Sequence, residues 1–166
     1  LTISYGFMAD LDSDEETARA HDGYSKVLEI AKKLVDLEPN NLTFLRSLAI
    51  SYDRLACLES NVDGGRAREG YAKALEIAQK LVDLEPENLT FLRGLSIYHN
   101  HLADLDSNVD VARARQGYAI ALEISKRLVD LVPENLMLLR NLSITYNKLA
   151  DLDGNVDTGR AREGYA

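Results

Sequence analysis

The sequence has few of the residues from which disulfides and metal sites are built. Cys57 is the only cysteine among 166 residues, which excludes a disulfide within the chain and a zinc site based on cysteine ligands. Tryptophan is absent and proline occurs only three times. No apolar run approaches the roughly 18 residues that a membrane-spanning helix needs. We therefore expect no metal, no cofactor and no membrane partner.

Positive charge is also scarce. The chain carries 19 Lys and Arg residues against 27 Asp and Glu residues, which gives a net charge of -8. Nucleic-acid binding requires clustered basic residues, so we do not expect nucleic acid as a partner. Hydrophobic residues make up 46% of the sequence and charged residues 28%, a composition that is typical of a folded chain.

The dominant feature of the sequence is an internal repeat with a period of 47 residues. Adjacent full copies are identical at about two thirds of their positions, and a period between 20 and 50 residues is typical of solenoids and propellers. We predict a single array over residues 1–166, cut from a longer one. It comprises a partial copy at 1–22, full copies at 23–69, 70–116 and 117–163, and the start of another at 164–166.

Each copy predicts two helices. In the middle copy, the first stretch has apolar residues at spacings of three and four up to the break at Pro86, and so does the second stretch up to Asp106. Asn108 or Asp110 is then positioned to cap the next helix. No alternation with a period of two appears, so the predicted fold class is all-α, built from antiparallel helix pairs.

Three short patterns carry a resemblance to a known family. They are Leu48-Ala49-x-x-Tyr52 with its counterpart Leu142-Ser143-x-x-Tyr146, Tyr71-x-x-Ala74 with Tyr118-x-x-Ala121, and the prolines Pro39, Pro86 and Pro133. Together they resemble the tetratricopeptide repeat (TPR), a helix–turn–helix unit of 34 residues. This resemblance implies an α-solenoid with a right-handed superhelix, whose first helices line a concave face that binds peptides.

The sequence departs from the family pattern in two respects. Leu45, Leu92 and Leu139 occupy the position at which the family has tryptophan. The unit is also about 13 residues longer than the family period. The additional residues lie between the motif pieces, so we expect both helices of each pair to be longer by one to two turns.

The stretch that follows the proline in each copy corresponds to the first helix of a TPR pair, and we call it the first helix. A rotation of about 100° per residue separates the two sides of each first helix. In the first full copy, Leu45, Leu48, Ala49, Tyr52 and Leu55 share the side that is predicted to pack. The opposite side is the candidate binding face. Over the three copies this face consists of Thr43, Arg46, Ile50, Asp53, Arg54, Thr90, Arg93, Ile97, Asn100, His101, Met137, Arg140, Ile144, Asn147 and Lys148.

Basic residues recur on this candidate face. Arg46, Arg93 and Arg140 are identical in the three full copies, while Arg54, His101 and Lys148 form a second series. Such a face would suit a protein or an extended peptide that is acidic or ends in a carboxylate. The alternative for the arginines is a structural ladder of ion pairs to Asp36, Asp83 or Glu85. For the second series the alternative is ordinary surface solvation.

Other patterns favour structural roles. Arg113-Ala-Arg115 and its counterparts are predicted to pair with the acidic turns beside them. Asp10-x-Asp12-x-Asp14 lacks the glycine and the closing glutamate of a calcium loop, so we interpret it as an exposed acidic turn.

Gly23, Gly70 and Gly117 lie inside predicted helices, where each glycine costs about 1 kcal/mol relative to alanine. This predicts close approach of a neighbouring helix, against an aromatic residue such as Tyr52.

The sequence therefore favours a binding function over a catalytic one. Catalysis requires a unique constellation of residues, whereas most residues here have a counterpart 47 positions away. We expect no enzyme but a module that binds a protein or a peptide. The alternative is a structural scaffold that assembles end to end into a rod or filament, because near-identical units with uncapped ends can stack on one another.

Overall fold

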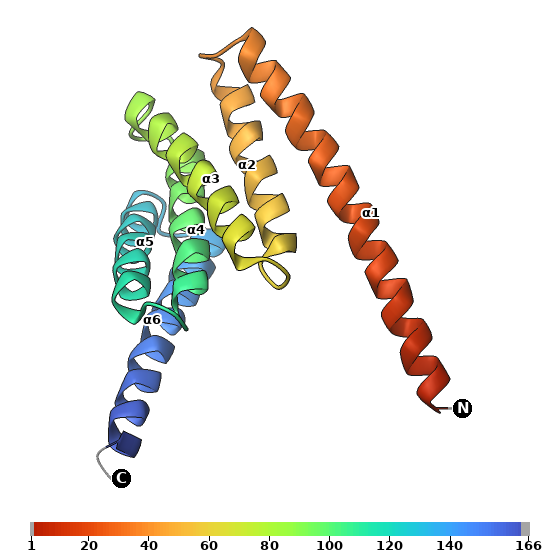
Figure 1. The fold of residues 1–166 in the computed structure, drawn as a ribbon. Helices are drawn as coiled ribbons and strands as arrows, with labels where there is room; N and C mark the ends of the chain where they lie inside the picture. The colour runs from red at the N-terminus through yellow and green to blue at the C-terminus, as the bar shows by residue number, and fades with distance from the viewer. Residues whose placement is uncertain (1, 164–166) are drawn as a thin grey trace. The chain divides into compact units, whose positions relative to one another are not determined.

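The computed structural model describes the backbone of residues 2–163 and the side chains of residues 15–154. Within that range the protein is all-helical. Its six helices are α1 (Thr2–Leu37), α2 (Leu42–Glu59), α3 (Gly64–Leu84), α4 (Leu89–Asp106), α5 (Val111–Leu131) and α6 (Leu136–Glu163) (Figure 1). The chain divides into two compact units, Leu1–Ile77 and Ala78–Ala166, with the boundary inside α3.

Helix lengths follow the 47-residue period in the interior of the chain. The first helices α2 and α4 have 18 residues each, and the second helices α3 and α5 have 21 each. Turns of four residues join consecutive helices. The predicted all-α fold class and the close packing of consecutive helices are confirmed for the described residues.

The first helix of every full copy begins at an asparagine cap. The side-chain oxygen of Asn88 accepts hydrogen bonds from the backbone N–H groups of Thr90, at 3.0 Å, and Phe91, at 3.3 Å. Asn41 and Asn135 cap α2 and α6 in the same way. Such a cap satisfies donors that have no partner within the helix. The second helix α5 is capped by Asp110, one of the two predicted residues. The Asp110 carboxylate accepts a hydrogen bond of 3.0 Å from the backbone N–H of Arg113.

In the first unit, α1 and α2 form an antiparallel pair around a small apolar core. Leu28, Ala31 and Leu48 are buried there, with Tyr52 and Leu55 packed against them. The start of α3 closes on α2 at Gly70. A Cβ added to Gly70 would lie 2.8 Å from the Cβ of Ala56, so only glycine permits this approach.

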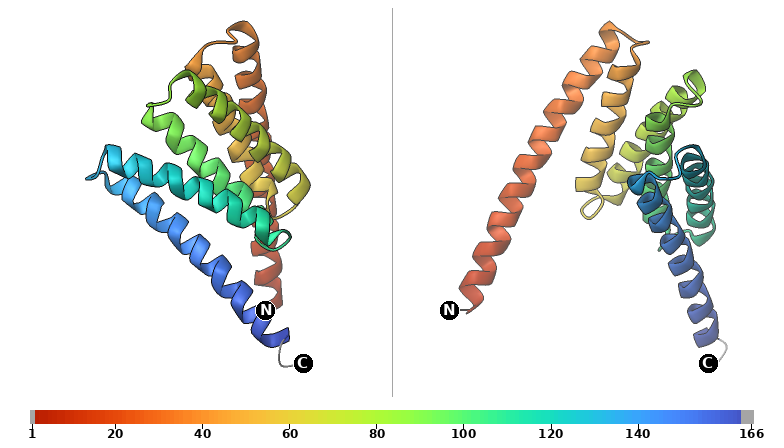
Figure 2. Two further views of the ribbon diagram at one scale, coloured as in Figure 1. Left: turned by 90° about the vertical axis from the view of Figure 1, so that its left-hand side faces the viewer. Right: turned by 180° about the vertical axis from the view of Figure 1, so that it is seen from behind.

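In the second unit, α4, α5 and α6 pack side by side (Figure 2). Ala103, Ala114, Tyr118 and Leu152 form a buried cluster that joins the three helices. A Cβ added to Gly117 would lie 3.0 Å from the Cβ of Ala103. Close helix approach, as predicted, is thus confirmed at Gly70 and Gly117, although the neighbour is an alanine and not an aromatic ring.

Two expectations at the outer copies are wrong. Residues 10–14 were expected to form an acidic turn, yet α1 continues through them as one helix. Gly23 was expected to approach a neighbouring helix, yet nothing lies within 4 Å of a Cβ added to it. Glu16 occupies the place of Asp63 and Asp110, whose carboxylates cap α3 and α5. Asp157 retains the aspartate in the last copy, yet α6 runs through it as well, so the capping residue alone does not decide whether the turn forms. Likewise, α6 continues past Gly154. Its counterpart in the middle copy is Ser107, whose hydroxyl donates to the Asp104 carbonyl where α4 ends.

Candidate functional site

The predicted binding residues lie on the three first helices α2, α4 and α6. On α2, in the first unit, Thr43, Arg46 and Arg54 are exposed, whereas Ile50 and Asp53 are half-buried. The packing side of the same helix is as predicted, because Leu45 and Ala49 are 4% and 2% exposed. The α2 part of the candidate face is therefore open to a partner.

One predicted residue on α4 is not part of an open surface. Asn100 is buried, and its side-chain amide donates a hydrogen bond of 3.0 Å to the Thr145 hydroxyl on α6. Thr145 is itself fully buried and donates to the Asn141 carbonyl at 3.1 Å. Asn100 therefore joins two helices instead of facing a ligand. The prediction missed this because the turn of α4 that carries Asn100 is covered by α6.

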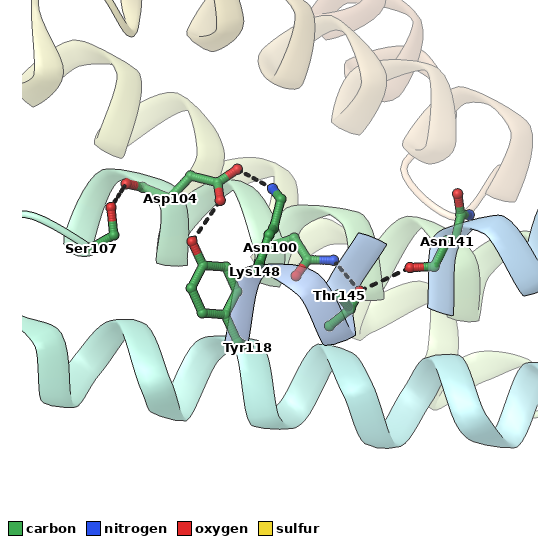
Figure 3. A network of polar contacts seen from close by, with 7 residues as sticks. All are labelled: Asn100, Asp104, Ser107, Tyr118, Asn141, Thr145 and Lys148. Carbon is green, nitrogen blue, oxygen red and sulfur yellow. Dashed lines mark hydrogen bonds and ion pairs between the residues drawn. The ribbon is translucent and has the colours of Figure 1, made fainter. Parts of the chain in front are cut away.

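A second network lies about one helical turn away and joins α4, α5 and α6 (Figure 3). Lys148 of α6 forms an ion pair with the Asp104 carboxylate of α4, and the Tyr118 hydroxyl of α5 donates to the same carboxylate at 2.7 Å. Burial of Tyr118 and its bond to Asp104 both raise the pKa of the phenol, so it stays protonated and serves as a donor. Lys148 was predicted to bind a ligand, but its charge is already neutralised by Asp104.

Sequence reasoning missed the bonds of Asp104 because they join residues of different helices; the aspartate itself recurs, as Asp151, in the third full copy. Cys57 takes its place in the first full copy. A hollow of about 400 Å³ lies beside this network and is lined by residues that include Tyr118, Lys148 and Asp151. Two of these residues, Lys148 and Tyr118, already bond to Asp104.

The remaining candidates of the second unit form what we call the α4–α6 face. On α4 its members are Thr90, which is exposed, and Arg93, Ile97 and His101, which are partly buried. On α6 Arg140 and Asn147 are exposed, as are Met137 at 52% and Ile144 at 40%. The face thus combines two arginines with three apolar residues, Ile97, Met137 and Ile144.

The arginine that recurs in the three full copies does not form the ladder of ion pairs that was the structural alternative. No ion pair in the described part of the chain involves Arg46, Arg93 or Arg140. The Glu85 carboxylate instead accepts from Asn88 at 2.7 Å, and Asp83 accepts from Gln79 at 2.8 Å. The Arg93 Nε atom is buried without a hydrogen-bond partner.

Arg113 and Arg115 are paired with acidic residues, as predicted, whereas their counterparts Arg160 and Arg162 lie outside the residues whose side chains are described. Arg113 contacts Asp106 at 3.6 Å and Asp110 at 3.0 Å, and Arg115 lies 2.6 Å from Asp153. These ion pairs connect the start of α5 to the end of α4 and to the interior of α6. The contrast with Arg93 and Arg140 separates structural arginines from those of the α4–α6 face.

Comparison with known proteins adds no assignment. Neither the protein-family models nor the curated proteins match this chain. No helix of the described residues is both long enough and apolar enough to cross a bilayer.

Proposed function

We propose that this protein is a non-catalytic binding module, an α-solenoid of the TPR type whose first helices hold an acidic peptide or protein segment. The observation that carries the proposal is the state of the two arginines on the α4–α6 face. Arg93 and Arg140 have no acidic partner among the described residues, and the Nε atom of Arg93 is buried without an acceptor.

A buried donor without a partner is costly, by about 1–3 kcal/mol. A carboxylate from a bound segment would remove this cost at Arg93 and would form charge-assisted hydrogen bonds with both guanidinium groups. The neighbouring side chains Ile97, Met137 and Ile144 would cover apolar side chains of the same segment. The face therefore suits a peptide in which acidic and apolar residues are interspersed.

The polar networks around the face support the proposal. The Asn100–Thr145 hydrogen bond and the Lys148–Asp104 ion pair both hold α4 against α6. A face that is fixed before binding loses less conformational entropy when the ligand arrives. These contacts therefore give the proposed face a defined geometry, even though they engage Asn100 and Lys148.

Fluorescence anisotropy with a labelled peptide of alternating glutamate and leucine tests the proposal. Arg93→Ala and Arg140→Ala are each expected to weaken binding about tenfold, since a hydrogen bond to a charged group contributes about 1.5–3 kcal/mol. Lys80→Ala is the matched control, because it removes one exposed positive charge from α3, outside the face. Equal affinity of all three variants and the parent protein would contradict the proposal.

A further inference from the structure

The α6 helix carries an apolar face that the described residues leave uncovered. Leu139 is 40% exposed and Tyr146 is 47% exposed, and both Ser143 and Ala150 are exposed. Their counterparts one period earlier are Leu92, His99, Ser96 and Ala103 on α4. Leu92, Ser96 and Ala103 are exposed by no more than 4%, so this side of the repeat is a packing surface.

The structure shows which element covers that surface on α4. The Ser96 hydroxyl donates to the Ala121 carbonyl of α5 at 3.1 Å, and Ala103 meets Gly117 of α5. The Tyr118 hydroxyl of α5 also donates a hydrogen bond to the Asp104 carboxylate of α4. The partner of a first helix is therefore the second helix that follows it, with its glycine, alanine and tyrosine on the shared side.

The α1 helix presents the matching surface, and none of the residues whose side chains are described covers it. Two periods before Gly117, Ala121 and Ile124 stand Gly23, Val27 and Ile30. Val27 is 51% exposed and Ile30 is 58% exposed, whereas Ala121 is fully buried. A Cβ on Gly23 would meet nothing within 4 Å, in contrast to Gly117.

We infer that a second copy of this chain covers both surfaces, with α6 of one copy docked on α1 of the next in the manner of α5 on α4. The period then pairs Ala150 with Gly23 and Ser143 with the backbone at Val27. It also brings the Tyr24 hydroxyl to Asp151, which is the counterpart of the Tyr118–Asp104 bond. Because the two surfaces differ, the contact is head to tail and leaves one of each kind open for further copies.

This association is separate from peptide binding on the α4–α6 face. It uses Leu139, Ser143, Tyr146 and Ala150 of α6, whereas the face uses Met137, Arg140, Ile144 and Asn147. Loss of one activity therefore need not remove the other.

Light scattering on a size-exclusion column tests the inference with two complementary variants. The parent chain is expected to gain mass as its concentration rises. Val27→Glu blocks the α1 surface and Leu139→Glu blocks the α6 surface, so each variant alone is expected to be monomeric. An equimolar mixture is expected to form a dimer and nothing larger, because one intact surface of each kind remains. Both residues are substantially exposed, so neither variant should unfold.

Val109→Glu is the matched control, since Val109 is 84% exposed in the turn before α5 and lies on neither surface. It is expected to associate like the parent chain. A parent chain that stays monomeric at all concentrations would overturn the inference, and so would a mixture without the dimer. If the parent chain stays monomeric and Val27 is nevertheless protected from solvent, the chain's own residues cover the α1 surface.

Discussion

Gly70 and Gly117 show how single residues set the spacing between helices. Each allows its helix to approach the preceding one so closely that an added Cβ would lie 2.8 or 3.0 Å from an alanine Cβ. The cost of glycine inside a helix, near 1 kcal/mol, is offset by this packing. The sequence alone predicted the close approach, but it could not identify Ala56 and Ala103 as the neighbours.

Gly70→Ala is expected to lower the free energy of unfolding by about 1–3 kcal/mol, because the added methyl group forces α2 and α3 apart. Gly154→Ala is the control, since a Cβ there meets nothing within 4 Å. It should raise stability by up to about 1 kcal/mol through helix propensity. Urea unfolding of both variants measures the difference. A gain in stability for Gly70→Ala would contradict the packing argument.

His99 makes stability depend on pH in a way that its tyrosine counterparts do not. Burial lowers the pKa of His99 below its ordinary value of 6.5. The unfolded chain therefore binds the proton more readily, and the stability present above pH 6.5 is lost as the pH falls below that value. Tyr52 and Tyr146 occupy the same place in the neighbouring copies.

His99→Tyr is expected to reduce the loss of stability between about pH 8 and about pH 5. Urea unfolding at both pH values measures this loss for the parent protein and for the variant. Carboxylates titrate in both proteins and cancel in the comparison. An equal loss in the two proteins would show that His99 is not the group responsible.

At the scale of elements, α4 and α6 are held together by residues that do not repeat. Asn100 has Asp53 and Asn147 as counterparts, while Thr145 has Ser51 and Tyr98. A prediction made from the shared pattern of the copies cannot identify a contact that exists in only one of them. The same reason explains why the Asp104 network was missed, and why Asn100 and Lys148 were placed on the binding face.

A double-mutant cycle on Asn100→Ala and Thr145→Val tests this contact between elements. The coupling free energy is expected to be about 0.5–1.5 kcal/mol, the typical net contribution of a hydrogen bond. A control cycle pairs Asn100→Ala with Ser125→Ala, since Ser125 bonds to Ser96 and shares no hydrogen bond with Asn100. Coupling that is no larger than in the control would remove the proposed role of this bond in fixing the face.

The ends of elements were predicted well only where the capping residues are retained. Asp63 and Asp110 cap α3 and α5, and the sequence identified Asp110 as a candidate cap. Glu16 at the equivalent place does not preserve the turn, and α1 runs through it. Asp157 retains the aspartate in the last copy, yet α6 also runs through the place of the turn. The capping residue therefore does not by itself decide where a helix ends.

At the scale of the whole molecule, the net charge of -8 conceals two classes of basic residues. Arg113, Arg115 and Lys148 are neutralised by aspartates of neighbouring helices. Arg93 and Arg140 have no such partner among the described residues. An acidic protein can therefore still offer a local site for a carboxylate, because charge pairing and not total charge decides which cations are available.

The helical fold and the packing side of the first helices could be predicted because hydrophobic spacing encodes them directly. The binding face could be predicted only as a set of exposed positions. Which of its residues are free depends on contacts between helices, and these arise from residues 40 or more positions apart, such as Lys148 and Asp104.

The most direct test of the proposed binding face is an NMR titration that observes the side-chain Nε–H signals of the arginines. On addition of the peptide of alternating glutamate and leucine, the signals of Arg93 and Arg140 are expected to shift. Those of Arg113 and Arg115 should stay in place, because their ion pairs occupy them. Shifts confined to Arg113 and Arg115, or no shift at any arginine, would contradict the account.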